Sequence, residues 1–377
     1  MRGGLRERSP GVWEVRVERG RDPVTGRRLQ ISRTVRGGKR EAQRKLNALL
    51  AEVDEGTTSS SDAKFRDVAE RWLRLTKADL SPTTFRRYRG LLEHHIYPAL
   101  GNRAAASIRT SELDELYLGL IERKNLSAAS VRQVHAVIRR ALQQAVRWGW
   151  IRTNPATDTT PPRVPPSTIS PPEVGQVLAL LAAADTAYPE FGRFLRVAVT
   201  SGARRGELCA LRWRNVDWDN ATLTIARAVV EVEGGLFEKD TKTHAVRRIA
   251  LDGATVDVLR THHAAANATA AAAEIELPVN AFVFTHDPAG GRPWTPDHVT
   301  KAFQRFRRKV GADAVRLHDL RHFAATQLLA AGVPVRTVSG RLGHANAATT
   351  LGVYAHFVEQ SDRDAANALS HLLADPT

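Results

Sequence analysis

The chain has 377 residues, and its 55 Lys and Arg residues outnumber its 40 Asp and Glu residues, which gives a formal net charge of +15. Its 42% hydrophobic and 25% charged residues are typical of a folded soluble protein and exclude a chain that is disordered throughout. At roughly 100–200 residues per domain this length predicts two or three domains, and the positive charge favours nucleic acid or an acidic membrane surface as the partner.

Residues 1–57 are predicted to form a small three-stranded sheet with one helix. Apolar and charged residues alternate in VWEVRVERG (12–20), which is the pattern of a half-buried strand, and RLQISRTV (28–35) is a second strand-like run. From 39 to 53 the apolar residues recur at helical spacing. The polar stretch EGTTSSSD (55–62) is then a flexible linker.

Residues 64–156 are predicted to be entirely helical. Ser81 followed by Pro82 indicates the start of a helix, because Ser caps and Pro fits the first turn. A later helix, 127–148, has an apolar face and leaves its arginines for the opposite face. The apolar stripe of the first helix comprises Phe65, Val68, Trp72 and Leu75.

The proline-rich stretch 154–173 can continue neither helix nor strand, so it predicts a linker and a domain boundary. From 168 to 377 the patterns are mixed: ATLTIARAVVEV (221–232) and RRIALD (247–252) are predicted strands, and most of the remainder is helical. The predicted fold class is α+β and multidomain. It comprises a small sheet-and-helix domain, an all-helical domain and a mainly helical domain with a small antiparallel sheet.

Several kinds of site are excluded by missing residues or motifs. Cys209 is the only cysteine, which excludes an intramolecular disulfide and a multi-cysteine zinc site and fits a reducing cytoplasm. The motifs G-x-x-x-x-G-K-[ST], G-x-G-x-x-G and H-E-x-x-H are absent. His318 and His322 lie four residues apart, but Arg321 lies beside them, so no metal is expected. No signal peptide or membrane-length apolar segment is present, so we expect a cytoplasmic protein without a membrane partner.

Three motifs in the last half of the chain contain cationic residues and a tyrosine. TSGARRGELCALRW (200–213) has an arginine just before a predicted helix, and LHDLRHFAAT (317–326) has a histidine and an arginine on one helix face. RLGHANAATTLGVYAH (341–356) has a histidine ten residues before a tyrosine. Each residue alone has an ordinary structural explanation. The residues concerned are Arg204, His318, Arg321, His344 and Tyr354.

Together and in this order, the three motifs resemble those of the tyrosine recombinases, the phage integrase family. The resemblance is close over 195–358 and extends more loosely to the whole chain, whose layout is similar to that of integrases. It implies an arm-type DNA-binding domain at 1–57, a helical core-binding domain at 64–156 and a catalytic domain at 168–377.

The resemblance also implies roles for single residues. It puts the nucleophile at Tyr354 and a supporting acidic position at Glu207. The family's catalytic lysine lies on a β-hairpin, for which EKDTKTHAVRRIALD (238–252) is the candidate, with Lys242 as the first choice and Lys239 as the second. The remaining catalytic positions fall on Arg204, His318, Arg321 and His344.

The chemistry of phosphodiester cleavage explains these residue types. Attack by a hydroxyl builds negative charge on the non-bridging oxygens, which two guanidiniums can bind. A free tyrosine, with a pKa near 10, is ionised only about one part in a thousand at pH 7, so nearby arginines must stabilise the phenolate. Fixed cations can replace a metal here, and no cofactor is expected.

The implied activity is site-specific recombination, in which duplex DNA is cleaved and rejoined through a 3′-phosphotyrosyl intermediate to integrate or excise a phage or other mobile element. The implied partners are double-stranded attachment sites, other copies of the chain in a tetramer on DNA, and an accessory bending or directionality factor. The tail 361–377 is expected to dock on a neighbouring subunit. Candidate DNA-contacting residues are Arg16, Arg28, Arg86, Arg87, Arg132, Arg139 and Arg140.

Two alternatives remain open on sequence grounds. A type IB topoisomerase shares the chemistry but only relaxes supercoils, and the basic segment 1–57 favours an integrase over it. A catalytically inactive DNA-binding regulator of the same fold is the second alternative. Every catalytic position carries the functional residue type, which argues against such decay.

Overall fold

The computed structural model divides into two compact units, 1–166 and 167–377, and each is described by itself. No helix among the described residues is long and apolar enough to cross a membrane. The described residues are 3–21, 26, 28–54, 62–165, 170–232, 235–241, 246–343, 366–367, 369–370 and 373.

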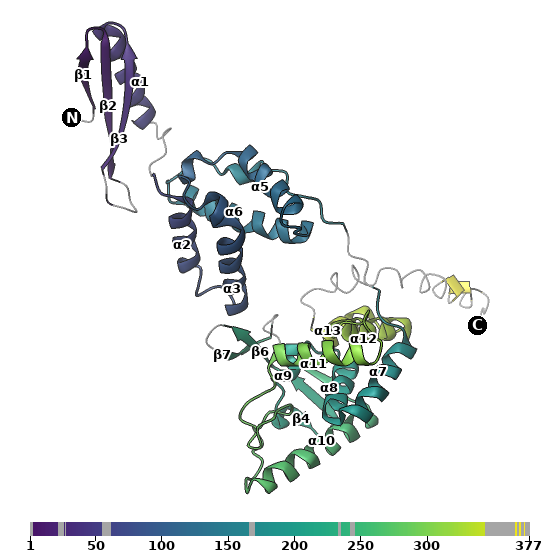
Figure 1. Ribbon diagram of the computed structural model, residues 1–377. Coiled ribbons are helices and arrows are strands. Elements are labelled where there is room, and N and C mark those ends of the chain that lie inside the picture. Colours follow the sequence, from purple (N-terminus) through teal and green to yellow (C-terminus); the bar gives the residue numbers. More distant parts are fainter. Residues whose placement is uncertain are drawn as a thin grey trace. The chain divides into compact units, whose positions relative to one another are not determined.

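The chain begins with an antiparallel sheet of order β1-β2-β3 and a helix packed against it (Figure 1). Val15 and Val17 of the middle strand are buried against Ala42 and Leu46 of the helix, as the two periodicities predict. The elements are β1 (Gly3–Ser9), β2 (Val12–Arg21), β3 (Arg28–Arg36) and α1 (Lys39–Asp54).

The rest of the first unit is helical, as predicted, and has its own apolar core. Ser81 caps a helix, since its Oγ accepts a hydrogen bond from the Thr84 N–H at 3.3 Å. Leu75 was expected on the buried stripe but is 57% exposed, because it ends its helix beyond the core. The elements are α2 (Phe65–Leu75), α3 (Pro82–Leu91), a π-helical segment (Leu92–Ile96), α4 (Tyr97–Leu100), a 3₁₀ turn (Ala105–Ser107), α5 (Thr110–Glu122), α6 (Ala128–Arg147) and a 3₁₀ turn (Pro155–Thr157).

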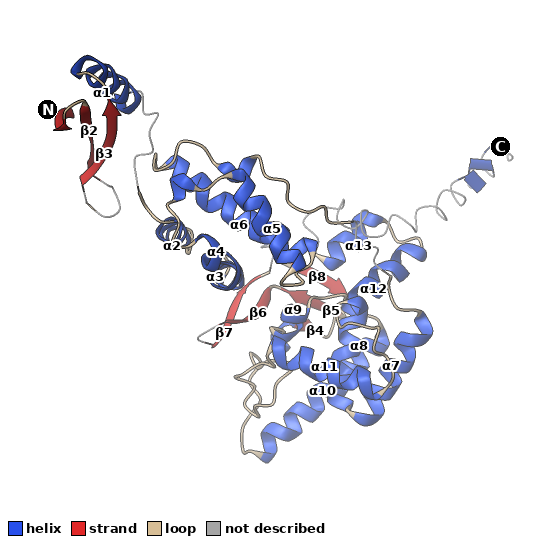
Figure 2. Ribbon diagram, turned by 45° about the horizontal axis from the view of Figure 1, so that its top comes forward, coloured by secondary structure: helices blue, strands red, loops and turns tan. Residues whose placement is uncertain are grey.

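The described residues of the second unit are mainly helical, with two small antiparallel sheets (Figure 2). Its apolar core includes Phe194, Leu208, Phe284 and Phe303. The helices are α7 (Val174–Ala187), α8 (Pro189–Ser201), α9 (Arg205–Cys209), a 3₁₀ turn (Trp213–Asn215), α10 (Gly253–Ala272), α11 (Pro296–Lys309), α12 (Asp319–Ala330) and α13 (Val335–Leu342). The strands are β4 (Val216–Asp217), β5 (Thr222–Ile225), β6 (Arg227–Val232), β7 (Gly235–Asp240) and β8 (Arg247–Ala250).

Two strand predictions need correction. The run 221–232 is two strands that meet at Ala226: β5 pairs with β4 and β8, whereas β6 pairs with β7. The hairpin expected over 238–252 therefore lies over 227–240, and among the described strands β7 and β8 do not pair. Burial explains the difference, because Ile249 of β8 is buried opposite Leu223 of β5. The predicted α+β class is confirmed.

Candidate functional site

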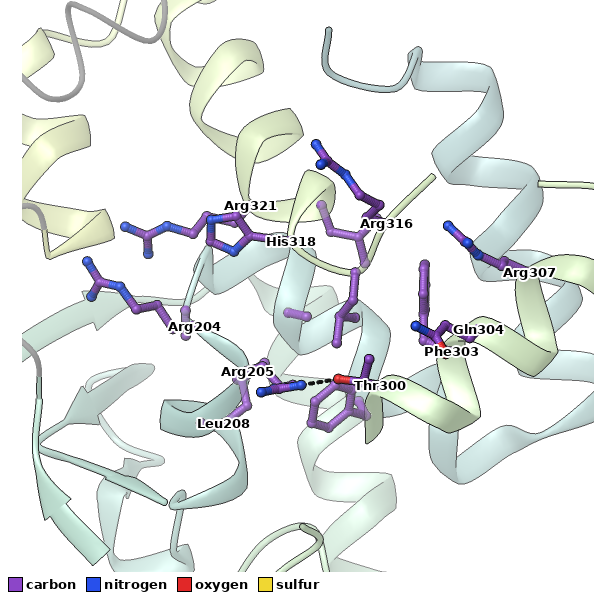
Figure 3. Close-up of a pocket in the computed structure, with 16 residues that line it drawn as sticks. Arg204, Arg205, Leu208, Thr300, Phe303, Gln304, Arg307, Arg316, His318 and Arg321 are labelled. Carbon is purple, nitrogen blue, oxygen red and sulfur yellow. Dashed lines mark hydrogen bonds between the residues drawn. The ribbon is translucent and has the colours of Figure 1, made fainter. Parts of the chain in front are cut away.

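A cavity of about 600 Å³ in the second unit is lined by five arginines and a histidine (Figure 3). Its walls come from α8, α9, α11, α12 and the segment before α12. None of the described residues that line it is Asp or Glu, so the cavity favours an anion. Its cationic and titratable lining residues are Arg204, Arg205, Arg307, Arg316, His318 and Arg321.

Arg204 lies immediately before α9, and its side chain has two fixed anchors. Its Nη1 donates to Glu207 Oε1 at 2.9 Å, and its Nη2 donates to the Gly343 carbonyl at 3.0 Å. The Arg204 backbone N–H also donates to Glu207 Oε2 at 2.8 Å, which completes the cap of the helix. The side chain keeps 25% of its surface exposed, so the guanidinium still reaches solvent.

Glu207 is a buried carboxylate shared by two arginines. Arg247, the first residue of β8, donates to both of its oxygens, at 3.2 Å from Nη1 and at 2.6 Å from Nη2. Burial alone would raise the pKa of the Glu207 carboxyl, but the hydrogen bond and charge of Arg247, followed by the contacts of Arg204, hold that pKa below its ordinary value. The carboxylate is therefore ionised at neutral pH and can orient both guanidiniums.

Arg321 lies in the first turn of α12 and is 4% exposed. Its Nη1 donates to the carbonyls of Gly202 and Leu342 at 2.6 and 2.7 Å. Leu342 and Gly343 are consecutive, so Arg321 and Arg204 are held by neighbouring carbonyls at the C-terminal end of α13. Figure 3 shows the two guanidiniums extending toward the same side, with the His318 ring beside Arg321.

His318 lies immediately before α12 and is kept neutral by its surroundings. Burial, followed by the nearby His322 and Arg321, lowers the pKa of His318 from 6.5 to about 4. Its ring makes an edge-on contact with His322 at 4.8 Å between centroids. A neutral imidazole at pH 7 can accept a proton, which a permanently charged group cannot.

Of the catalytic residues predicted from sequence, the structure brings Arg204, His318 and Arg321 together at this cavity, with Glu207 behind Arg204. Lys239 lies on β7, opposite Ala228 of β6. Lys242, His344 and Tyr354 lie outside the described residues, as does most of the tail 361–377.

The candidate DNA-contacting arginines lie in the first unit. Arg86 and Arg87 are exposed on α3, and the three candidates of α6 are exposed on the side away from its apolar face. Arg16 is half-buried and donates to Glu14 at 2.9 Å, and Arg28 is exposed on β3. The three residues of α6 are Arg132, Arg139 and Arg140.

Sequence reasoning missed Arg247 and the three further arginines of the cavity. Arg247 and Ile249 alternate with exposed residues in β8, so the strand pattern places an arginine on the buried face. This alternation in the sequence could have indicated a buried arginine that needs a carboxylate partner, but not which acidic residue that partner is. The arginines missed in the cavity are Arg205, Arg307 and Arg316.

Two segments of the chain match known families. Residues 173–361 match the phage integrase family, and residues 65–161 match the phage integrase central domain. The chain belongs to the phage integrase family. It is therefore a tyrosine recombinase by family, as the three motifs imply.

Relatives and solved structures of this family resemble the chain over nearly its whole length. An integrase of Saccharopolyspora erythraea is 26% identical, covering 96% of this chain and 94% of the relative. The Tn1549 transposon integrase in complex with transposon right end DNA shares the fold, with a TM-score of 0.67, 20% identity, and 82% of this chain and 100% of that chain covered. The lambda integrase of a tetramer bound to a Holliday junction matches with a TM-score of 0.59 and 17% identity. The match covers 92% of this chain and 94% of that chain.

Proposed function

We propose that this phage integrase family member is a site-specific recombinase that cleaves and rejoins duplex DNA with Tyr354 as its nucleophile. The observation that carries the proposal is the cavity in which Arg204, Arg321 and His318 meet, with no Asp or Glu among the described residues that line it. A phosphodiester is the anion that suits this set, since two guanidiniums can bind its two non-bridging oxygens. The membership of the chain in the family supports the same conclusion.

The two arginines are the proposed phosphate ligands. Both are anchored by backbone carbonyls, so their orientation is set before DNA binds and little reorganisation is needed during the reaction. The scissile phosphate would accept hydrogen bonds from Arg204 and Arg321, which both line the cavity. Negative charge that develops on the phosphate in the transition state is then stabilised by fixed cations, and the proposal needs no metal.

Proton transfer is assigned to a histidine and a lysine among the predicted catalytic residues. His318, neutral at pH 7, accepts the proton of the Tyr354 hydroxyl as its oxygen attacks phosphorus. The bond from phosphorus to the 5′ oxygen breaks, and Lys242, or Lys239 in its place, donates the proton that this oxygen needs to leave. His344 donates a hydrogen bond to the phosphate.

The product of cleavage is a 3′-phosphotyrosyl bond and a free 5′-hydroxyl. The phosphotyrosyl ester keeps the energy of the broken phosphodiester, so a 5′-hydroxyl from a second strand can attack it and release Tyr354 without ATP. Exchange of strands between two attachment sites follows from this second attack. Integration or excision of a phage or other mobile element is the proposed outcome.

Binding to DNA is assigned to all three predicted domains. Residues 1–57 would bind arm-type sites, residues 64–156 the core site, and residues 168–377 the scissile phosphate. The solved lambda integrase tetramer on a Holliday junction supports assembly of four copies on DNA. In this assembly the tail 361–377 is proposed to dock on a neighbouring subunit. An accessory bending or directionality factor and a cytoplasmic location complete the proposal.

A nicked suicide substrate tests the proposal, because the fragment lost after cleavage traps the covalent intermediate. Wild-type protein incubated with a DNA fragment that spans the candidate attachment site should give a protein–DNA adduct on a denaturing gel. Tyr354→Phe should bind the same DNA on a native gel and give no adduct. Cleavage by that variant would refute the nucleophile, and DNA binding without an adduct by wild type across the ends of the element would favour the inactive regulator.

A further inference from the structure

Arg247 touches both of the groups that anchor Arg204. Its guanidinium binds the two Glu207 oxygens, and Glu207 in turn binds the Arg204 side chain. Its Nε donates to the Arg341 carbonyl at 2.9 Å, close to the end of α13, where Gly343 accepts from Arg204. The 8% exposure of its side chain shows that Arg247 is inside the protein, and it does not line the cavity.

Gly343 allows Arg247 to approach closely because it has no side chain. Its φ of +69° is favourable for glycine, and a Cβ at this position would lie 2.8 Å from Arg247 Nη1. The guanidinium therefore packs directly on the glycine backbone that carries the second anchor of Arg204. One side chain from β8 thus joins the start of α9, through Glu207, to the end of α13.

We propose, on the basis of the recombinase function above, that Arg247 is a positioning residue for DNA cleavage: it holds Glu207 and the end of α13 so that Arg204 meets the scissile phosphate in the reactive geometry. Arg247 does not contact DNA. Its effect on the reaction passes through Arg204.

The first test compares Arg247→Gln with Arg248→Gln. Arg248 is the next residue of β8 and is exposed, so it controls for loss of one positive charge from the strand. Under single-turnover conditions with saturating suicide substrate, we expect Arg247→Gln to form the covalent adduct about 10- to 100-fold more slowly, with DNA affinity unchanged within about twofold. Arg248→Gln should cleave at the wild-type rate.

A neutral scissile group separates positioning from general damage to the fold. In a methylphosphonate substrate one charged non-bridging oxygen is replaced by a methyl group, so an exact placement of Arg204 matters less. The ratio of wild-type to Arg247→Gln rates should therefore fall toward one on this substrate. An unchanged ratio would contradict a role through Arg204.

Two further variants keep the test valid where Arg247→Gln is poorly folded, since that substitution removes one of the two arginines that bind the buried Glu207 carboxylate. Arg247→Lys keeps a positive charge, but one ammonium group cannot replace the fork that contacts both Glu207 oxygens and the Arg341 carbonyl. The pair Glu207→Gln with Arg247→Gln removes the buried carboxylate together with the arginine that neutralises most of its charge. We expect the pair to recover thermal stability while cleavage stays slow.

The possible failures are distinguishable. If wild type forms the adduct and the Arg247 variants cleave at the same rate, the positioning role is overturned and the recombinase function stands. Recovery of full cleavage together with stability in the double variant would overturn it equally, because the role of Arg247 would then be stability alone. If wild type itself forms no adduct at its attachment site, the recombinase function and the positioning role both fall.

Discussion

Arg204 and Arg321 receive their orientation from backbone carbonyls, and these acceptors have a particular value at a phosphate site. A carbonyl cannot be titrated and carries no full charge, so it fixes a guanidinium without cancelling its positive charge. Glu207 is the exception among these acceptors, and it is shared with Arg247, so the three side chains together keep a net positive charge. The cluster can therefore still attract a phosphate.

The neutral state of His318 predicts a pH dependence of stability. Burial lowers the pKa of His318, and that of His262, from 6.5 to about 4. As pH falls from 6.5 toward 4, the unfolded chain takes up protons that the folded chain does not, so the free energy of unfolding decreases over this window. Urea unfolding of His318→Gln at pH 7 and pH 5 should show a smaller decrease than wild type. Equal decreases would mean that His318 titrates normally in the folded protein.

The family motifs were sufficient to predict that Arg204, His318 and Arg321 lie together, and the structure places all three at one cavity. They were not sufficient for Arg247, whose partner Glu207 is 40 residues away. That pairing depends on the register of β8 against β5 and on where α9 packs, and neither follows from local patterns. Arg307 of α11, which lines the cavity, was missed for the same reason, because helix packing decides which face meets the cavity.

At the scale of elements, helix ends position the site. Arg204 and His318 lie at helix starts, while the carbonyls that hold the two arginines lie at the ends of α8 and α13. Gly202 and Gly343 end these helices in the left-handed conformation, which is the usual glycine C-terminus. The chain direction therefore reverses at the points where the carbonyls must face the guanidiniums.

Gly202→Ala should disturb this arrangement. An added Cβ would lie 2.6 Å from Leu342 Cδ2, and the residue has a φ of +61°. We expect a loss of about 1–3 kcal/mol in the free energy of unfolding, and slower adduct formation because the Gly202 carbonyl holds Arg321. Gly332→Ala is the matched control, with a φ of +75° and no atom near its added Cβ. An equal effect of the two substitutions would show that backbone strain alone is responsible.

The strand errors have a similar explanation. The pattern of 221–232 is continuous in hydrophobicity, but its two halves join different sheets, and only pairing partners distant in sequence reveal the break at Ala226. Helices were easier to predict because their periodicity and caps are local, as Ser81 illustrates. Leu75 was predicted to be buried but is exposed, since periodicity identifies the apolar face of a helix but not how far the core extends along it.

At the scale of the whole molecule, the predicted domains should separate DNA-binding functions. Deletion of residues 1–57 should leave cleavage of the core site within a few-fold of wild type, because the cavity lies in the second unit. The same deletion should abolish binding to arm-type sites and impair integration. Native gels with core and arm fragments, combined with an integration assay, measure both effects. Normal integration by the truncated chain would refute the arm-binding assignment.

The net charge of +15 predicts that DNA binding depends strongly on salt. Each phosphate contact releases counterions, so with about 6–10 contacts the affinity should fall about 10³- to 10⁵-fold between 50 and 200 mM salt. Measurement of the dissociation constant across this range gives the number of contacts from the slope. A shallow slope would indicate that the excess of Lys and Arg serves another purpose.

The proposed mechanism depends on Tyr354 as the nucleophile, and identification of the residue linked to DNA tests this role most directly. The adduct from a suicide substrate should be digested with nuclease and protease and analysed by mass spectrometry. We predict a nucleotide attached through its 3′ phosphate to the peptide that contains Tyr354. Attachment to another residue, or through a 5′ phosphate, would contradict the proposed mechanism.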